Sequence, residues 1–106
     1  MTDYVYDTRA IVDEPLIITV TAGSSKTVGL NGDTAGLCVR MIPGGGGTAT
    51  LQSTLNSWAQ IDAATAVWVT SSAGAVSVNT DQTLLADNVR GLKLTATTQN
   101  AVFHVG

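Results

Sequence analysis

The sequence predicts an all-β protein: a single antiparallel β-sandwich or barrel of eight to nine short strands with an extended N-terminal arm. Three observations lead to this prediction. Short runs rich in Val, Ile, Leu and Thr recur throughout the chain, and Gly, Ser, Asn and Asp separate them. The runs follow one another at intervals of about ten residues, as in sandwiches and barrels. No interval between consecutive runs after residue 66 is long enough for a helix.

Length and composition fit one domain with a neutral surface. The chain has 106 residues, of which 44% are hydrophobic and only 12% are charged. An ordinary soluble domain carries about 25% charged residues. In this chain Thr, Ser, Ala and Gly take the place of the missing charged residues, so the surface repels neighbouring molecules weakly. This composition favours a protein that is packed against other copies or partners.

The charge pattern argues against several classes of partner. The net charge is −3, and the basic residues are well separated: Arg9, Lys26, Arg40, Arg90 and Lys93. A nucleic-acid site needs clustered cations, so we expect no nucleic-acid partner. No apolar run approaches the roughly 20 residues that span a bilayer, so we expect no membrane partner. The acidic first residues are unlike a secretory signal, and we expect assembly in a host cytoplasm.

Residues 1–15 read as an arm that precedes a domain over residues 16–106. Four of the eight carboxylates and both tyrosines lie in this segment, which Pro15 closes. One interpretation is a first edge strand folded on its own domain. The other is an extended arm laid across a neighbouring subunit, for which Tyr is well suited because it buries a large ring and keeps a polar tip. The contact residues expected in the arm are Tyr4, Val5, Tyr6 and Arg9.

The next strands follow from alternation and turn residues. Residues 16–22 alternate strictly, which predicts a half-buried strand. A short strand is expected over residues 26–30, and Asn31-Gly32-Asp33 is typical of a tight hairpin turn. Residues 37–42 form the following strand, with Cys38 and Arg40 on the face opposite the core.

Residues 48–61 fit two structures. Leu51, Leu55 and Trp58 have helical spacing, but the residues between them are poor helix formers. We favour a strand over Thr48–Leu55 and an irregular loop through Trp58, while residues 63–65 could add a helical turn. Further strands are expected over residues 66–70, 75–79, 83–86, 89–97 and 101–105. Trp68, between two valines, is expected in the core.

No catalytic, cofactor or metal site emerges from the residue pattern. Gly44, Gly45, Gly46 and Gly47 lack the Lys-Ser/Thr pair of a phosphate loop, so they predict a flexible tip that serves as a second contact surface. Cys38 is expected to be a small buried residue, and His104 to make a surface or inter-subunit hydrogen bond. The acids, including Asp81, are expected as single turn residues and not as a calcium cluster. The protein is not expected to be an enzyme.

From about Gly47 onward the order of features resembles small virion proteins of tailed bacteriophages. The matching pieces cover a little over half of the chain: a Thr/Ser-rich strand (48–55), an Ile-Asp-Ala-Ala-Thr-Ala-Val-Trp connection (61–68), a Ser-Ala-Gly turn (72–74), a Leu-Leu strand (84–85), the run 89–97 and a closing apolar strand that ends at 105–106. In those proteins a basic and a small residue precede the penultimate strand, as Arg90 and Gly91 do in this chain.

This resemblance implies a β-sandwich that coats or joins parts of a phage particle. The first hypothesis is a capsid decoration, or cement, protein on the head surface that binds the major capsid protein, with a homo-oligomer expected and a trimer favoured. A second keeps the protein in the virion, at the neck, tail or fibre base. A third is a soluble carbohydrate-binding module that uses Trp58. An enzyme would need Cys38 or His104 to meet two acids in a pocket.

Overall fold

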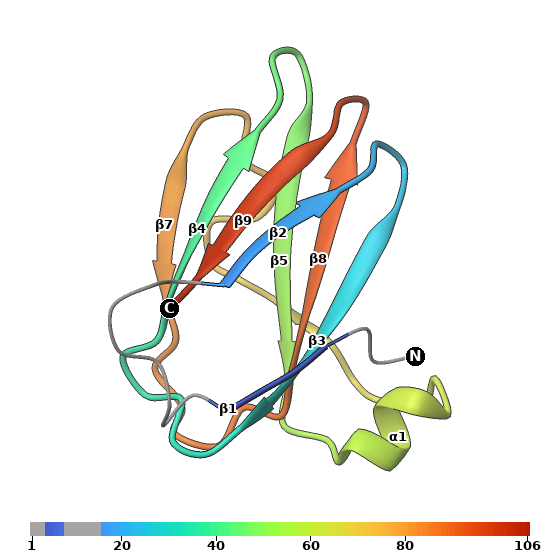
Figure 1. Ribbon diagram of the computed structural model, residues 1–106, viewed down its shortest axis with the longest axis vertical. Coiled ribbons are helices and arrows are strands. Elements are labelled where there is room, and N and C mark those ends of the chain that lie inside the picture. Colours follow the sequence, from blue (N-terminus) through green and yellow to red (C-terminus); the bar gives the residue numbers. More distant parts are fainter. Residues whose placement is uncertain (1–3, 8–15) are drawn as a thin grey trace.

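The structure is a computed structural model that describes residues 4–7 and 16–106. These residues form nine strands and one short helix, and Figure 1 labels them. In chain order they are β1 (Tyr4–Asp7), β2 (Leu16–Val20), β3 (Ser25–Asn31), β4 (Cys38–Pro43), β5 (Thr48–Thr54), α1 (Trp58–Asp62), β6 (Val69–Thr70), β7 (Thr80–Thr83), β8 (Gly91–Thr97) and β9 (Ala101–Val105). The expected all-β fold is confirmed.

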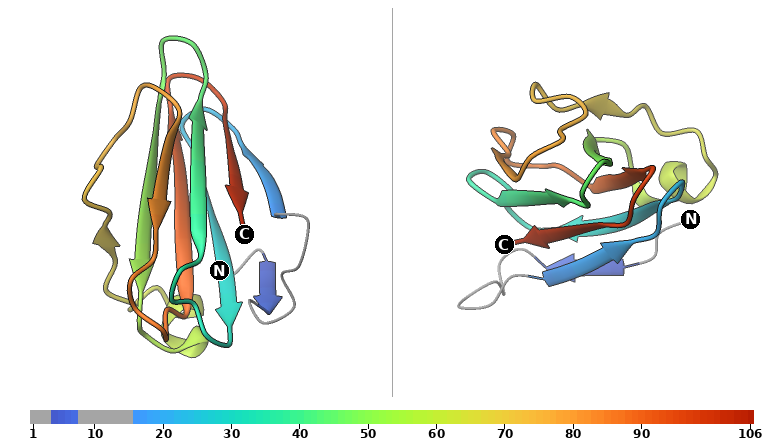
Figure 2. Two further views of the ribbon diagram at one scale, coloured as in Figure 1. Left: turned by 90° about the vertical axis from the view of Figure 1, so that its left-hand side faces the viewer. Right: turned by 90° about the horizontal axis from the view of Figure 1, so that it is seen from above.

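Two sheets lie face to face, as the view from above in Figure 2 shows. One has five strands in the order β1-β3-β8-β5-β6, and the other has four in the order β2-β9-β4-β7. Among the described residues, every pairing of strands is antiparallel except that of β1 with β3, which is parallel. The backbone of Tyr4–Asp7 therefore forms an edge strand of its own domain, which is the first of the two interpretations of this segment.

Alternation along the strands sends one set of side chains into the gap between the sheets. In β2, Ile18 and Val20 are buried whereas Ile17 and Thr19 are exposed, as the sequence predicts. The largest fully buried side chain, Phe103, comes from β9 and packs with aliphatic residues of both sheets. Burial of such side chains contributes roughly 1.5–3 kcal/mol each, so this apolar layer is the main source of stability.

The expected hairpin at Asn31-Gly32-Asp33 is wrong. Gly32 does have a positive φ of 93°, but β3 pairs with β1 and β8, while β4 belongs to the opposite sheet. The connection crosses between the sheets and is anchored by Thr34, which is fully buried. Its hydroxyl donates to the Ala86 carbonyl (2.8 Å) and accepts from the Val89 amide (3.0 Å).

The strand expected over Thr48–Leu55 is confirmed as β5, but the loop expected through Trp58 is wrong because α1 begins at that residue. Ser57 caps the helix: its hydroxyl accepts from the Gln60 amide, and the Gln60 side chain accepts from the Ser57 amide. Such a capping box satisfies two otherwise unpaired donors. Reciprocal capping and burial of Ile61 therefore outweigh the weak helix propensity of this segment.

Trp68 is not in the core, contrary to the sequence-based prediction. It is half-buried, and the Lys93 ammonium lies 4.8 Å from its ring centroid. A Cβ at Gly91 would lie 3.4 Å from the indole and 2.7 Å from the Ile61 side chain. The missing side chain at Gly91 therefore makes room for Ile61 and Trp68 on the outer face of the five-stranded sheet.

Two further strand predictions need correction. Residues 75–79 contribute only an isolated bridge between Val76 and Ala49, and the strand expected over 83–86 occurs earlier, over Thr80–Thr83. The short apolar runs are still informative, because Val76 and Leu84 are both buried in the core. These runs mark positions where an irregular segment inserts a side chain into the core.

Candidate functional site

The outer face of the four-stranded sheet is nearly neutral and partly apolar. We call it the four-stranded face and define it by the outward residues Ile17, Thr19, Cys38, Arg40, Ile42, Asp81, Thr83, Val102 and His104. The pairing places Ile17, His104, Arg40 and Asp81 in one row across the sheet. Ile17 is 61% exposed, so the row presents an apolar side chain to solvent.

The two charged residues of the four-stranded face, Arg40 and Asp81, form an ion pair and neutralise each other. The Arg40 guanidinium donates from Nε to Asp81 Oδ1 (2.7 Å) and from Nη2 to Oδ2 (3.0 Å). The hydrogen bond to Asp81 raises the pKa of Arg40, and the same hydrogen bond lowers the pKa of Asp81. Asp81 thus lies within β7 and pairs with a strand neighbour, and it is not the single turn acid that the sequence predicts.

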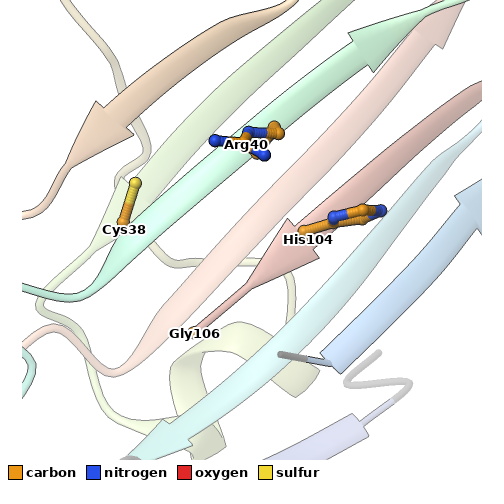
Figure 3. A pocket seen from close by; sticks show the side chains of 4 residues that line it. All are labelled: Cys38, Arg40, His104 and Gly106. Carbon is orange, nitrogen blue, oxygen red and sulfur yellow. The ribbon is translucent and has the colours of Figure 1, made fainter. Parts of the chain in front are cut away.

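A shallow hollow of about 190 Å³ lies on this face and is lined by Cys38, Arg40, His104 and Gly106. Figure 3 shows Cys38 and Arg40 on β4 and His104 on the neighbouring β9. Arg40 is opposite His104 in the pairing, whereas Cys38 is opposite Thr83 on the other side. Within residues 4–7 and 16–106, no three His, Cys, Asp or Glu residues are grouped so that they could hold a metal ion.

A second hollow, of about 360 Å³, lies beside the start of α1. Trp58, Arg90, Asn31 and Ser57 line it. The Trp58 indole N–H donates to the Arg90 carbonyl (2.9 Å), which fixes the ring against the end of β8. Trp58 remains partly exposed, so one part of the indole can meet a ligand.

A third hollow, of about 390 Å³, opens beside β6, and we call it the β6 flank. Its described lining holds no charged residue and consists of Ser53, Thr54, Leu55, Asn56, Val67, Val69, Ala86 and Val89. Leu55, Val67 and Val69 are each more than half exposed. Val69 is paired with Ser53 on the core side of the sheet, but no strand of the opposite sheet covers this margin (Figure 2).

The Gly44–Gly47 segment is a tight turn between β4 and β5. The Gly47 amide donates to the Gly44 carbonyl (2.9 Å), and Gly46 has a φ of 83°, as in a type II turn. A Cβ at Gly44 or Gly47 would come within 2.8 Å of Gln99. Two of the four glycines are thus needed for packing against the turn between β8 and β9, and Gly45 and Gly46 are the exposed ones.

Of the four predicted contact residues in the arm, the structure describes the backbone of three. The backbone of Tyr4, Val5 and Tyr6 belongs to β1, which pairs with Val28, Gly29 and Leu30 of β3. Arg9 lies outside the described residues. The structure does not bring this strand and the Gly44–Gly47 turn together, because β1 pairs with β3 at one margin of the five-stranded sheet, whereas the turn leads into β5, which β8 separates from β3.

The exposed apolar residues of the four-stranded face and the β6 flank were not among the predicted contact residues. Alternation in residues 16–22 already places Ile17 on the outer side, and that signal could have identified it. For Val67 and Val69 no such signal exists, because the sequence does not tell where the opposite sheet ends.

Comparison with protein-family models finds no family that matches the chain, and no curated protein is similar to it. Among the residues that the structure describes, no helix is long and apolar enough to cross a membrane.

Proposed function

We propose that this protein is a structural component of a tailed-bacteriophage particle, a decoration protein that attaches to the outside of the head. The order of sequence features from Gly47 onward supports the proposal, as does the low share of charged residues. The observation that carries it furthest is the four-stranded face, where an exposed Ile17 lies in the same row as a self-neutralised ion pair, with His104 between them. Such a face can be buried against another protein without leaving a charge unpaired.

Attachment of this kind works through contact area. A stable protein–protein interface buries about 1,600 Å² in total. Repeated attachment of an oligomer across a lattice increases retention without any new contact, since the second contact becomes intramolecular. A sheet face whose charges are paired with each other suits the first requirement, and an oligomer, still a sequence-based prediction, would meet the second.

The test uses phage heads that lack the protein and measures binding of the purified chain to them. Ile17→Asp should weaken binding by about tenfold or more, because it places a charge in the proposed contact. The matched control is Val78→Asp. Val78 is 70% exposed and lies in the connection before β7, so this variant should bind as the wild type does. Equal binding by both variants would remove the four-stranded face from the proposal.

The predicted contacts of the arm are tested in the same assay. Deletion of residues 2–12 removes Tyr4, Val5, Tyr6 and Arg9 and should reduce binding. Undiminished binding would show that the arm has no part in attachment. The location on the particle is tested separately by copy number: hundreds of copies indicate the head lattice, whereas a dozen or fewer indicate the neck, tail or fibre base.

A second candidate function is supported by the hollow beside α1. There Trp58 offers part of its ring beside Arg90, Asn31 and Ser57, a combination of aromatic and hydrogen-bonding groups that suits a sugar. A glycan-binding assay tests it with Trp58→Ala and, as a control on the outer face of the five-stranded sheet, Thr95→Ala. No binding by the wild type removes this candidate.

A further inference from the structure

The margin of the five-stranded sheet at β6 carries unused hydrogen-bonding groups. The Ser71 amide donates to the Leu51 carbonyl (2.9 Å), so these two residues form a hydrogen-bonded pair. Bonded and non-bonded pairs alternate along antiparallel strands. The next pair, Thr70 with Gln52, is therefore non-bonded, and the N–H and C=O of Thr70 point away from β5.

The same alternation extends the margin beyond the two residues of β6. The Val67 amide donates inward to the Asn56 side chain (2.8 Å), as the Ser71 amide donates inward to Leu51. The backbone groups of Trp68, between these inward positions and two residues from Thr70, therefore face outward as well. β6 is the last strand of its sheet among residues 4–7 and 16–106 (Figure 2), so this margin can accept another strand.

We propose that β6 pairs with β6 of a second copy of this chain, antiparallel and around a two-fold axis at Val69. In this register Trp68 of one copy is opposite Thr70 of the other, and the outward groups of both residues form hydrogen bonds in each direction. The two five-stranded sheets become one continuous sheet. An isologous contact of this kind needs a surface that complements itself, and a margin with outward groups on residues 68 and 70 meets that need.

The charge and polarity of the β6 flank favour a second copy as the occupant. Two copies of a chain with net charge −3 repel each other, and an uncharged contact patch adds no close like-charge pair to that repulsion. The described lining of the flank has no charged residue. The pairing also brings the two copies of Val69 face to face and covers Val67 and Leu55, which are 69% and 58% exposed in the monomer. Burial of this apolar area stabilises the dimer.

The inference does not depend on attachment to a phage head, because purified protein alone tests it. It also differs from the trimer that the resemblance favours. A two-fold contact through one edge closes after two copies.

The first measurement is sedimentation equilibrium over a concentration series. The wild type should reach twice the 10.9 kDa monomer mass. Val69→Lys should weaken dimerisation at least about tenfold, since it brings two cations together at the axis. Thr70→Pro should do the same, because it removes an outward N–H that the monomer does not use. Val78→Lys, an equally exposed valine beyond the Val76 bridge at the other end of β5, should leave the dimer unchanged.

The second measurement locates the axis. Residues opposite each other in a non-bonded antiparallel pair have Cα atoms about 4.5 Å apart, within the roughly 4.4–6.8 Å that a disulfide spans. In a Cys38→Ser background, Val69→Cys should form a disulfide-linked dimer on mild oxidation, and Val78→Cys should not. A monomer at every concentration, a dimer that Val69→Lys does not weaken, or pairing of this edge only with a strand of another protein would overturn the proposal.

Discussion

At the scale of single residues, two glycines set how closely neighbouring turns and strands approach. Gly47 faces the backbone of the turn between β8 and β9: a Cβ there would lie 2.8 Å from both the Gln99 nitrogen and the Thr97 oxygen. These atoms can give way only if the turn itself moves. At Gly91 the nearest atom is the end of the Ile61 side chain, which can adjust more easily.

Substitution of the Gly44–Gly47 turn should therefore depend strongly on position. Gly47→Ala should lower the free energy of unfolding by about 1–3 kcal/mol, the usual cost of forcing extra atoms into a packed site. Gly45→Ala should change it by less than about 0.5 kcal/mol, since a Cβ at Gly45 meets nothing within 4 Å. Urea unfolding of both variants measures the difference. Equal effects would show that the turn is not packed as described.

The Arg40–Asp81 pair should make the stability of the fold depend on pH. Its hydrogen bond holds the pKa of Asp81 below the ordinary value of 3.8. The pair therefore contributes stability above pH 3.8, and the contribution is lost as the pH falls through the lower pKa of the folded state. The contribution is small because both side chains are about half exposed.

An NMR titration of the Asp81 carboxyl group measures this effect directly. Arg40→Gln should raise the pKa of Asp81 toward its ordinary value, since the charged donor is gone. Lys93→Gln, which removes a cation on the other sheet, should leave it unchanged. An Asp81 pKa that does not respond to Arg40→Gln would contradict the bidentate pair.

At the scale of elements, the sequence predicts best those strands whose two faces differ. Residues 16–22 and 101–105 alternate clearly, and both strands lie where expected. Asn31-Gly32-Asp33 misleads because the turn residues fix a local bend but not the partner of the strand. Trp68 misleads for a related reason: a large apolar residue next to a short strand can pack on the outer face, as Trp68 does over Gly91 and beside the Lys93 ammonium.

The short helix is another element that propensity did not favour, and its cap should be measurable. Ser57→Ala should lower the free energy of unfolding by about 0.5–2 kcal/mol, because the Gln60 amide loses its acceptor. Ser57→Asp should retain most of the stability, since a carboxylate can also cap the helix. Equal losses in both variants would show that the hydroxyl does not act as the cap.

At the scale of the whole molecule, the sandwich depends on one apolar layer between the sheets. Leu94 of β8 is fully buried in this layer. Leu94→Ala should lower the free energy of unfolding by about 2–5 kcal/mol, through lost burial and a residual cavity. Exposed Val78→Ala should change it by about 0.5 kcal/mol or less. Thermal or urea unfolding distinguishes the two cases.

The sequence predicts the fold better than it predicts which surfaces are used for contact. Neutral composition predicts that the protein functions through contact, but it does not say which face is used. The run Gly44–Gly47 is conspicuous in the sequence, yet two of its four glycines, Gly44 and Gly47, are needed for packing within the domain. The four-stranded face and the β6 flank arise from residues brought together across strands, and their apolar character depends on where the opposite sheet stops.

The central proposal is that this chain functions as a coat component that is retained by contact area. Quantitative mass spectrometry of tailed-phage particles purified from cells that produce the chain tests this proposal most directly. The account predicts hundreds of copies per particle, retained through washing at high salt because the contacts carry little charge. Absence of the chain from purified particles would contradict it.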